Sequence, residues 1–123
     1  MNPTRALRIA AITGFLAVAL GAFGAHVLKA TLEANGQVQT WQTAAHYHLV
    51  HAVVLLVLAL RTTVAPRPFL FFGAGIVIFS GSLYLLAVTN VRWLGAITPI
   101  GGICLLLGWL TLAFGRGRVT AAS

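Results

Sequence analysis

The sequence predicts an all-α integral membrane protein, in which four transmembrane helices form an up-down-up-down bundle with a short interfacial helix between the first two. Of the 123 residues, 59% are hydrophobic and only 7% are charged, whereas soluble domains carry about 25% charged residues. The charged residues also lie between apolar runs, each close to the roughly 20 residues that a helix needs to cross a bilayer. These runs cover residues 9–25, 44–60, 69–88 and 94–114.

The runs are continuously apolar, whereas the strands of a membrane β-barrel alternate apolar and polar residues. Helices are therefore favoured, and four of them account for most of the chain. We expect a single membrane domain over residues 1–123 with no separate soluble domain. Its predicted spans are about residues 6–26, 40–61, 68–88 and 93–114, with an interfacial connector at 27–39.

The first predicted span carries small residues at four-residue spacing, which lets helix backbones approach closely in lipid. Arg5 and Arg8 before an apolar stretch also resemble the start of a secretory signal. The apolar run is longer than the usual signal core of about 7–15 residues. We therefore expect this segment to remain as a transmembrane helix.

The connector after the first span predicts a short helix at the membrane surface. Leu28 and Leu32 share one helical face, and Asn35-Gly36 is a typical helix stop. The remaining connections, residues 62–68 and 89–93, are too short for anything but antiparallel neighbours.

Glycine is frequent, with 13 residues in the chain. Each glycine would weaken a helix in water by about 1 kcal/mol relative to alanine, so in this chain we interpret the small residues as helix contacts. The residues predicted to make these contacts are Ala17, Gly21, Ala25, Gly81, Pro99, Gly101, Gly102 and Gly108.

The net charge of +7 predicts topology rather than nucleic-acid binding. With four spans, six arginines fall on one side: Arg5, Arg8, Arg61, Arg67, Arg116 and Arg118. Positive charge collects on the cytoplasmic side of membrane proteins, so we expect a multi-pass protein of the cytoplasmic (inner) membrane with both termini in the cytoplasm. Trp41 and Trp93 would then belong to an aromatic belt at the outer face.

Polar side chains from all four spans fall at one predicted level, the outer half of the membrane. Such groups usually face the bundle interior or a cavity. His46 is excluded, because two residues turn a helix by about 200° and direct it away from His48. The candidate pocket residues are His26, Tyr47, His48, His51, Ser80, Ser82, Tyr84 and Thr98.

Four explanations of this polar level stay open. The side chains fix helix packing by hydrogen bonds across helices, or His26, Tyr47 and His51 line a pocket for a small ligand or lipid. A metal or b-type haem would use His26 with His48 or His51, although no carboxylate is available inside the membrane. A proton relay is the fourth. We predict no cofactor, and Cys104, the one cysteine, cannot form an internal disulfide.

Several blocks also resemble a known family: "LGAFGAH" (20–26), Tyr47 with His51, "FSGSLYLLA" (79–87) and "LGAITPIGGICLLLGW" (94–109). They are similar to the domain of unknown function 423 family, the YgdD-like small membrane proteins. The resemblance implies a four-helix protein of the bacterial cytoplasmic membrane and supplies no activity. It extends to His26, Tyr47, His51, Ser80, Gly81, Ser82, Tyr84, Thr98, Pro99, Gly101, Gly102 and Trp109. His46 and His48 depart from it, which leaves His26, Tyr47 and His51 as the set to test.

The residues argue against three functional classes. Small multidrug antiporters need a carboxylate within the membrane, and Glu33, the sole acid, lies in the connector. Small dual-topology fluoride channels need balanced charge, whereas this chain has six basic residues on one side and two on the other. No nucleophile and base have a recognisable spacing, so we do not expect an enzyme.

We therefore expect a small membrane protein that acts in binding or assembly, as an accessory component of a membrane complex or as a homo-oligomer. Its partners would be the lipid bilayer and other membrane proteins. The alternative is a binder or transporter of a small molecule, lipid, metal or haem that uses the pocket of His26, Tyr47 and His51.

Overall fold

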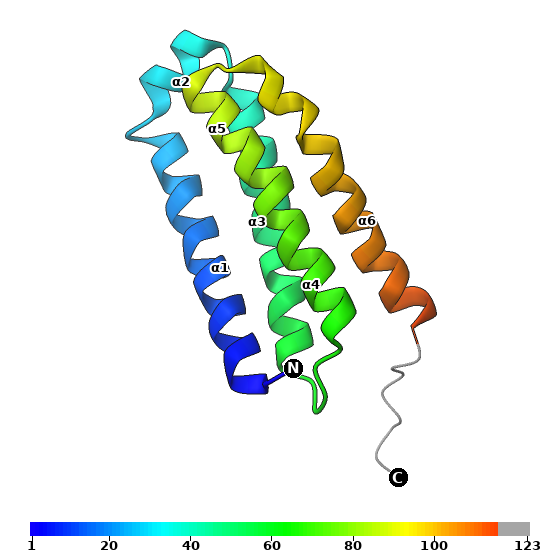
Figure 1. The fold of residues 1–123 in the computed structure, drawn as a ribbon. Helices are drawn as coiled ribbons and strands as arrows, with labels where there is room; N and C mark the ends of the chain where they lie inside the picture. Colours follow the sequence, from blue (N-terminus) through cyan, green and yellow to red (C-terminus); the bar gives the residue numbers. More distant parts are fainter. Residues whose placement is uncertain (116–123) are drawn as a thin grey trace.

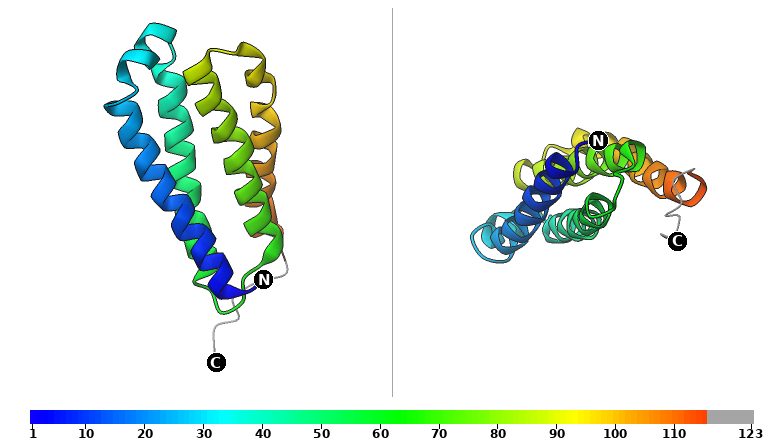
Figure 2. Two further views of the ribbon diagram at one scale, coloured as in Figure 1. Left: turned by 60° about the vertical axis from the view of Figure 1, so that its left-hand side comes forward. Right: turned by 90° about the horizontal axis from the view of Figure 1, so that it is seen from below.

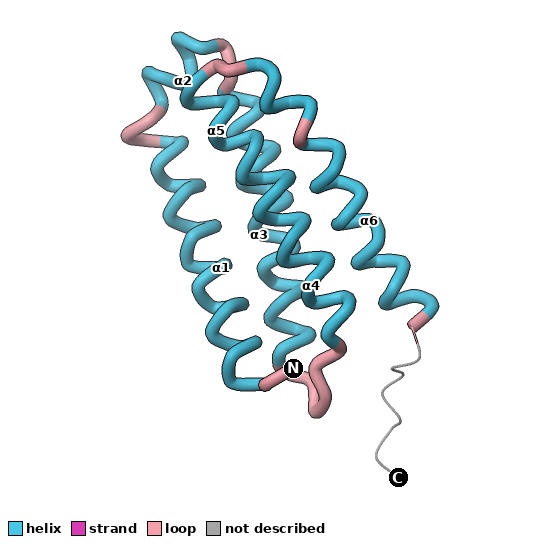
Figure 3. The backbone as a smooth tube through the Cα atoms, viewed as in Figure 1, coloured by secondary structure: helices cyan, strands magenta, loops and turns pink. Residues whose placement is uncertain are grey.

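The computed structural model describes residues 1–115, which are helical apart from short connections (Figure 1, Figure 3). Four stretches are long and apolar enough to cross a membrane, which confirms the predicted all-α membrane bundle. The elements are α1 (Pro3–Ala25), α2 (Lys29–Asn35), α3 (Val38–Ala59), α4 (Pro66–Gly75), the π-helical segment η1 (Ile76–Ser80), α5 (Gly81–Thr89), the 3-10 helix η2 (Arg92–Ala96) and α6 (Thr98–Phe114).

Helix α1 begins three residues before the predicted span because the sequence supplies a good N-terminal cap. The Asn2 side chain accepts hydrogen bonds from the backbone N–H groups of Thr4 and Arg5, at 2.9 and 3.3 Å. Pro3 occupies the first helical position, where a missing N–H costs nothing. The cap fixes the start of the first span.

Helix α2 is the predicted interfacial helix, and it ends at the predicted stop. Gly36 adopts a left-handed conformation with φ of 66°, and its N–H bonds back to the Glu33 carbonyl. The Asn35 side chain then donates to the carbonyls of Ala87 and Val88, at 2.9 and 3.0 Å. Helix α2 is thereby attached to the end of α5.

The third span is one continuous helical rod that changes its winding in the middle. Helix α4 begins with Pro66, continues as the π-helical turn η1, and resumes as α5 until Asn90, whose φ of 56° ends it. The sequence predicts one regular helix over residues 68–88. The wider turn at η1 is a feature that apolar periodicity does not signal.

The fourth span also differs from a regular helix. It begins with the 3-10 helix η2, and the α-helical part starts only at Thr98. Pro99 has no N–H, so the Gly95 carbonyl has no α-helical hydrogen-bond donor at this position. Proline suits the first turn of a helix, which explains why α6 starts here.

The four spans lie in a row rather than in a closed square (Figure 2). Helix α1 packs mainly on α3, α3 packs on α4, η1 and α5, and α6 packs on α4 and η1. Helices α1 and α6 lie at the two edges of the row (Figure 1). Each span therefore contacts chiefly its neighbours in the chain.

Two apolar clusters hold the row together, one near each end of the spans. The larger cluster surrounds the fully buried Phe72 and includes Leu55 of α3 and Leu105 of α6. The smaller cluster joins Leu32 of α2, Trp41 of α3 and Ala87 of α5. The predicted membrane-belt position of Trp41 is wrong, because its side chain is only 4% exposed and lies between helices.

The basic residues gather at one end of the molecule. The N-terminus, the α3–α4 connection and the end of α6 share that end, whereas α2 and η2 lie at the other (Figure 1). Arg5, Arg8, Arg61 and Arg67 therefore lie opposite the end that carries Lys29, Glu33 and Arg92. Arg116 and Arg118 lie outside the described residues.

Candidate functional site

His48, the histidine that departs from the family resemblance, joins three spans. Its Nε2 lies 2.9 Å from the carbonyl oxygen of Thr13 in α1, and its Nδ1 lies 2.9 Å from the Tyr84 hydroxyl of α5. A carbonyl only accepts hydrogen bonds, so Nε2 carries a proton, and in the neutral ring the Tyr84 hydroxyl then donates to Nδ1. The ring thus links α1, α3 and α5 with both nitrogens in use.

His51 makes the corresponding contacts toward the other edge of the row. Its Nδ1 lies 2.7 Å from the Tyr47 carbonyl, and its Nε2 lies 3.2 Å from the Trp109 indole nitrogen. The carbonyl requires a proton on Nδ1, and the indole N–H donates to the remaining lone pair. The ring also packs against Phe72, with ring centroids 5.6 Å apart. His51 therefore joins α3 to α6 and α4.

These hydrogen bonds occupy the lone pairs that a metal or haem iron would need. Ligation by His48 would break its bond to Tyr84, and ligation by His51 would break its bond to Trp109. Within residues 1–115, His, Cys, Asp and Glu side chains form no group of three that could hold a metal ion. The structure therefore does not assemble the metal or haem set of His26, His48 and His51.

The His51 contacts give a proton relay no path, because the Tyr47 carbonyl only accepts a hydrogen bond and the Trp109 indole only donates one. At His48 the Thr13 carbonyl likewise only accepts, whereas the Tyr84 hydroxyl can both accept and donate. The geometry therefore argues against a relay at His51 and does not decide the matter at His48.

The serine and threonine candidates also bond across helices. The buried Ser80 hydroxyl donates to the Ala44 carbonyl of α3 at 2.8 Å, although Ser80 lies in the π-helical segment η1. Ser82 bonds to Thr98 of α6 at 2.6 Å between hydroxyl oxygens. No buried side-chain nitrogen or oxygen in the described part of the chain lacks a hydrogen-bond partner.

His26 and Tyr47, the other members of the predicted pocket, lie on the outside. His26 is exposed just after the end of α1, and Tyr47 is 42% exposed. The Tyr47 ring lies against Phe79, with centroids 4.8 Å apart. The structure thus brings together His48, Tyr84 and Thr13, and separately His51 and Trp109. The Tyr47 and His51 rings stack with centroids 6.0 Å apart, but His26 does not join them.

Close contacts between helices occur at only some of the predicted small residues. A Cβ added at Gly101 would lie 2.2 Å from the backbone nitrogen of Phe79, and one added at Gly108 would lie 2.8 Å from the Phe72 ring. A Cβ added at Gly102 would make ordinary contact with Phe79 at 3.7 Å. These positions form the contact between α6 and the third span, together with Gly75, whose added Cβ would meet Leu105 at 2.5 Å.

The other predicted contact residues face outward or lie in open surroundings. A Cβ added at Gly21 or Gly81 would meet nothing within 4 Å, and Ala25 and Pro99 are exposed. On α1 the close contact is made instead by Gly24, where an added Cβ would lie 2.1 Å from the Trp41 indole nitrogen. Ala17 is buried as expected, at 3% exposure.

Sequence reasoning missed Thr13 and the inward position of Trp41, and it gave Gly24 only a secondary place among the small residues of the first span. Their signal is the apolar face of α1, on which Ala6, Ala10, Thr13, Ala17, Leu20 and Gly24 recur at alternating spacings of four and three. The Trp41 indole donates to the Leu20 carbonyl at 2.9 Å, on this same face. A search at this spacing, rather than at four residues alone, would have found the face that packs on α3.

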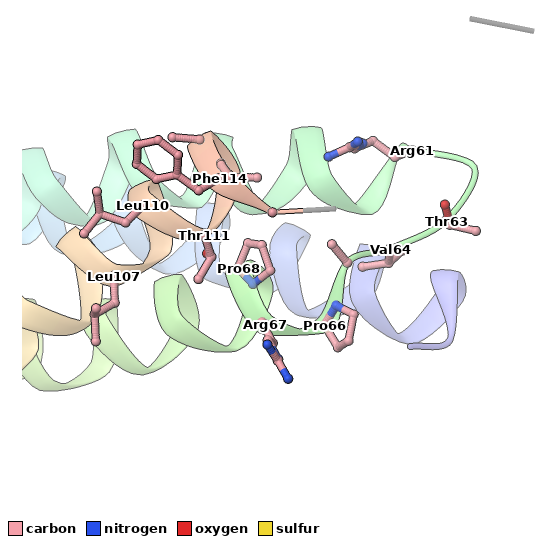
Figure 4. Close-up of a pocket in the computed structure, with 14 residues that line it drawn as sticks. Arg61, Thr63, Val64, Pro66, Arg67, Pro68, Leu107, Leu110, Thr111 and Phe114 are labelled. Carbon is pink, nitrogen blue, oxygen red and sulfur yellow. The ribbon is translucent and has the colours of Figure 1, made fainter. Parts of the chain in front are cut away.

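A cavity of about 930 Å³ lies at the basic end of the molecule, between the α3–α4 connection and the end of α6 (Figure 4). Most of its lining residues are apolar, and its two charged lining residues are Arg61 and Arg67. None of the predicted pocket residues lines it.

The sequence matches the family model described as "Protein of unknown function (DUF423)" over residues 20–102. It is 43% identical to the UPF0382 membrane protein YwdK of Bacillus subtilis, over 85% of this chain and 89% of that protein. It is 40% identical to the UPF0382 inner membrane protein YgdD of Escherichia coli K12, over 92% of this chain and 89% of that protein. No solved structure matches. Four apolar spans, the family match and relatives named as membrane proteins agree, and this chain belongs to the DUF423 family of small membrane proteins.

Proposed function

We propose that this protein is an assembly or accessory component of a membrane complex, in which α1 binds a helix of another membrane protein or of a second copy. The observation that carries the proposal is a face of small residues on α1 against which no other part of the described chain packs closely. Cβ atoms added at Gly14 and Gly21 would meet nothing within 4 Å. Small residues let helix backbones approach closely in lipid, where apolar burial gives no driving force.

The outward face has the spacing of a helix-packing seam. Its residues recur at alternating spacings of three and four, which keep one side of a helix against a partner. Each of its residues directly follows a residue of the face that packs on α3, so the two faces lie next to each other on α1. Only the first of these faces packs against another helix of the described chain. The outward residues are Ala11, Gly14, Val18, Gly21 and Ala25.

The polar side chains support this proposal over an enzyme or a pocket binder. Their hydrogen bonds are made within the chain, so they act as links between helices, each worth about 0.6 kcal/mol in a membrane. The alternative pocket of His26, Tyr47 and His51 receives no support from the exposed positions of His26 and Tyr47. We propose that the protein is not an enzyme.

The test is the size and composition of the native complex purified in mild detergent from its own membrane. We expect the wild-type chain to elute with a partner or as a homo-oligomer. The Gly14→Leu/Gly21→Leu variant should elute as a monomer, because the added side chains hold the partner helix away. The matched control is Ala22→Leu, which adds bulk at an exposed position outside the seam. A wild-type protein that purifies alone as a monomer would remove the proposal.

We further propose that both termini face the cytoplasm, because the basic end of the molecule carries them. The test uses a Cys104→Ser background with one new cysteine in each connecting region, Thr63→Cys or Ala34→Cys, both at exposed positions. In intact cells a membrane-impermeant thiol reagent should label Ala34→Cys and spare Thr63→Cys. The reverse pattern would invert the topology.

A further inference from the structure

The cavity at the basic end encloses space for a ligand, whereas the histidine clusters line no part of it. It lies where α3 ends, α4 begins and α6 ends, which are the ends of three candidate membrane spans. Its wall along α6 runs from Leu107 to Phe114. At 1.5 Å per residue this wall is about 10 Å long.

The charge around this cavity has one sign. Arg61 and Arg67 line it from the two ends of the α3–α4 connection, and Figure 4 shows them at two different edges, with the exposed Arg67 side chain directed outward. The sole acidic residue, Glu33, lies in α2 at the far end of the molecule. Arginine binds phosphate through a planar fork of N–H donors, and its aliphatic stem tolerates an apolar wall.

The backbone at the cavity contributes few donors of its own. Pro66 and Pro68 occupy the first turn of α4, and neither has an N–H. An anion in this position would therefore be held by the arginine side chains rather than by the start of a helix. Leu107, Leu110 and Phe114 form an apolar wall along α6, interrupted by Thr111 (Figure 4).

We propose that this cavity binds an anionic phospholipid, with its phosphate between Arg61 and Arg67 and its acyl chains along Leu107, Leu110 and Phe114. The positive charge of the two arginines favours an anion, and the apolar wall favours a lipid over free phosphate. The position of the cavity at the ends of the candidate spans matches the level of lipid headgroups. Basic pockets between helices at the cytoplasmic surface bind such headgroups in general. The site is separate from the outward face of α1, so the two proposals stand or fall independently.

The experiment is native mass spectrometry of the full chain in detergent, with phosphatidylglycerol or phosphatidylcholine of identical acyl chains added. We expect bound phosphatidylglycerol to exceed bound phosphatidylcholine. The Arg61→Gln/Arg67→Gln variant should lose about 25-fold in apparent affinity for phosphatidylglycerol, from about fivefold for each basic residue near the surface. The matched control, Arg5→Gln/Arg8→Gln, removes the same charge at the same end of the molecule from two exposed residues that do not line the cavity, and it should retain most binding.

A second variant tests the apolar wall without changing charge. Leu110 is 52% exposed, so Leu110→Trp adds bulk into the cavity with little risk to folding, which thermal unfolding checks. It should also weaken phosphatidylglycerol binding. Equal binding of the two lipids, equal losses in the two arginine pairs, unchanged binding in Leu110→Trp, or displacement of the lipid by millimolar inorganic phosphate would each overturn the proposal.

Discussion

At the residue scale, the two buried histidines show how polar groups are accommodated inside this membrane protein. Each ring gives its N–H to a backbone carbonyl and receives an N–H or O–H on its other nitrogen. Each ring is thus a two-sided connector, with no polar atom left facing lipid. Burying a polar histidine ring among apolar helices costs free energy, which its hydrogen bonds offset. Those hydrogen bonds also fix how the helices are aligned along one another, which apolar contact alone would leave variable.

The bond between His51 and Trp109 should be measurable as a coupling energy. In a double-mutant cycle of His51→Ala and Trp109→Phe, we expect a coupling of about 0.6 kcal/mol and no more than about 1.7 kcal/mol. Unfolding in mixed detergent micelles measures it. Trp93→Phe is the control, because Trp93 is 66% exposed, and it should change stability by less than about 0.5 kcal/mol. A coupling of zero would mean that this hydrogen bond does not stabilise the fold.

Gly101 should be the least replaceable of the glycines predicted to make helix contacts. A methyl group there would meet the Phe79 backbone, which cannot move aside as a side chain can. We expect Gly101→Ala to lower the free energy of unfolding by about 1–3 kcal/mol.

The neighbouring substitution Gly102→Ala is the matched control, because its methyl would make only ordinary contact with the Phe79 ring. Equal stabilities of the two variants in the same micelle unfolding experiment would show that α6 and the third span do not approach as closely as described.

At the scale of the element, the π-helical turn η1 sets the contacts of the third span. Phe79, within this turn, presents its backbone to Gly101 of α6, while the next residue, Ser80, bonds to Ala44 of α3. Adjacent residues thus serve the two neighbours of the third span in the row. A π-helical turn holds one more residue than an α-helical turn, and its neighbours α4 and α5 keep regular geometry on either side.

Deleting one residue from this turn should therefore be tolerated better than deleting one from a regular turn. Val77 is 71% exposed, so its removal costs little contact and converts η1 to an α-helical turn. Deleting Leu85, which is 57% exposed, rotates the residues after it by about 100° and displaces the buried Ala87. Expression and thermal unfolding of the two deletion variants provide the measurement. A Val77 deletion that is as harmful as the Leu85 deletion would contradict this role for η1.

The sequence was informative about elements wherever a local rule decides the outcome. Length and apolar content predict the four spans, and Asn35-Gly36 predicts the end of α2, because each depends on nearby residues. The partners of the polar residues were harder to predict. His48 and Tyr47 are adjacent in sequence, yet His48 is buried between helices and Tyr47 is half-exposed. This difference depends on where α1 and α5 lie, because they supply the partners of His48. That is a property of the assembled row, which a single-helix pattern does not contain.

At the scale of the whole molecule, the row arrangement leaves much of the first and fourth spans uncovered within the chain. Only 17% of the most apolar stretch of each is buried, against 39% for the second and third spans. The two edge helices therefore have the greatest area available to lipid or to a partner. This difference gives α1 room to act as an interaction helix while α3 and the third span hold the fold.

The row should also survive a cut in its middle connection. Residues 1–62 contain α1, α2 and α3, and residues 63–115 contain the remaining elements, so each part keeps its own pairs of packed spans. Co-expressed fragments 1–62 and 63–123 should copurify through the contacts of α3 with α4, η1 and α5. The His48→Ala change in the first fragment should weaken recovery, because it removes the bond to Tyr84. Fragments that never associate would show that the connection itself is needed.

The same row has a consequence for biosynthesis. A chain emerges from the ribosome N-terminus first, and here each new span packs chiefly on the span made just before it. The main packing partner of each new span is therefore already made, whereas the bonds of Asn35 to α5 and of His51 to Trp109 form when those later segments arrive. The order of synthesis is the order of assembly, so the buried polar links can form one pair of helices at a time as each span leaves the insertion machinery.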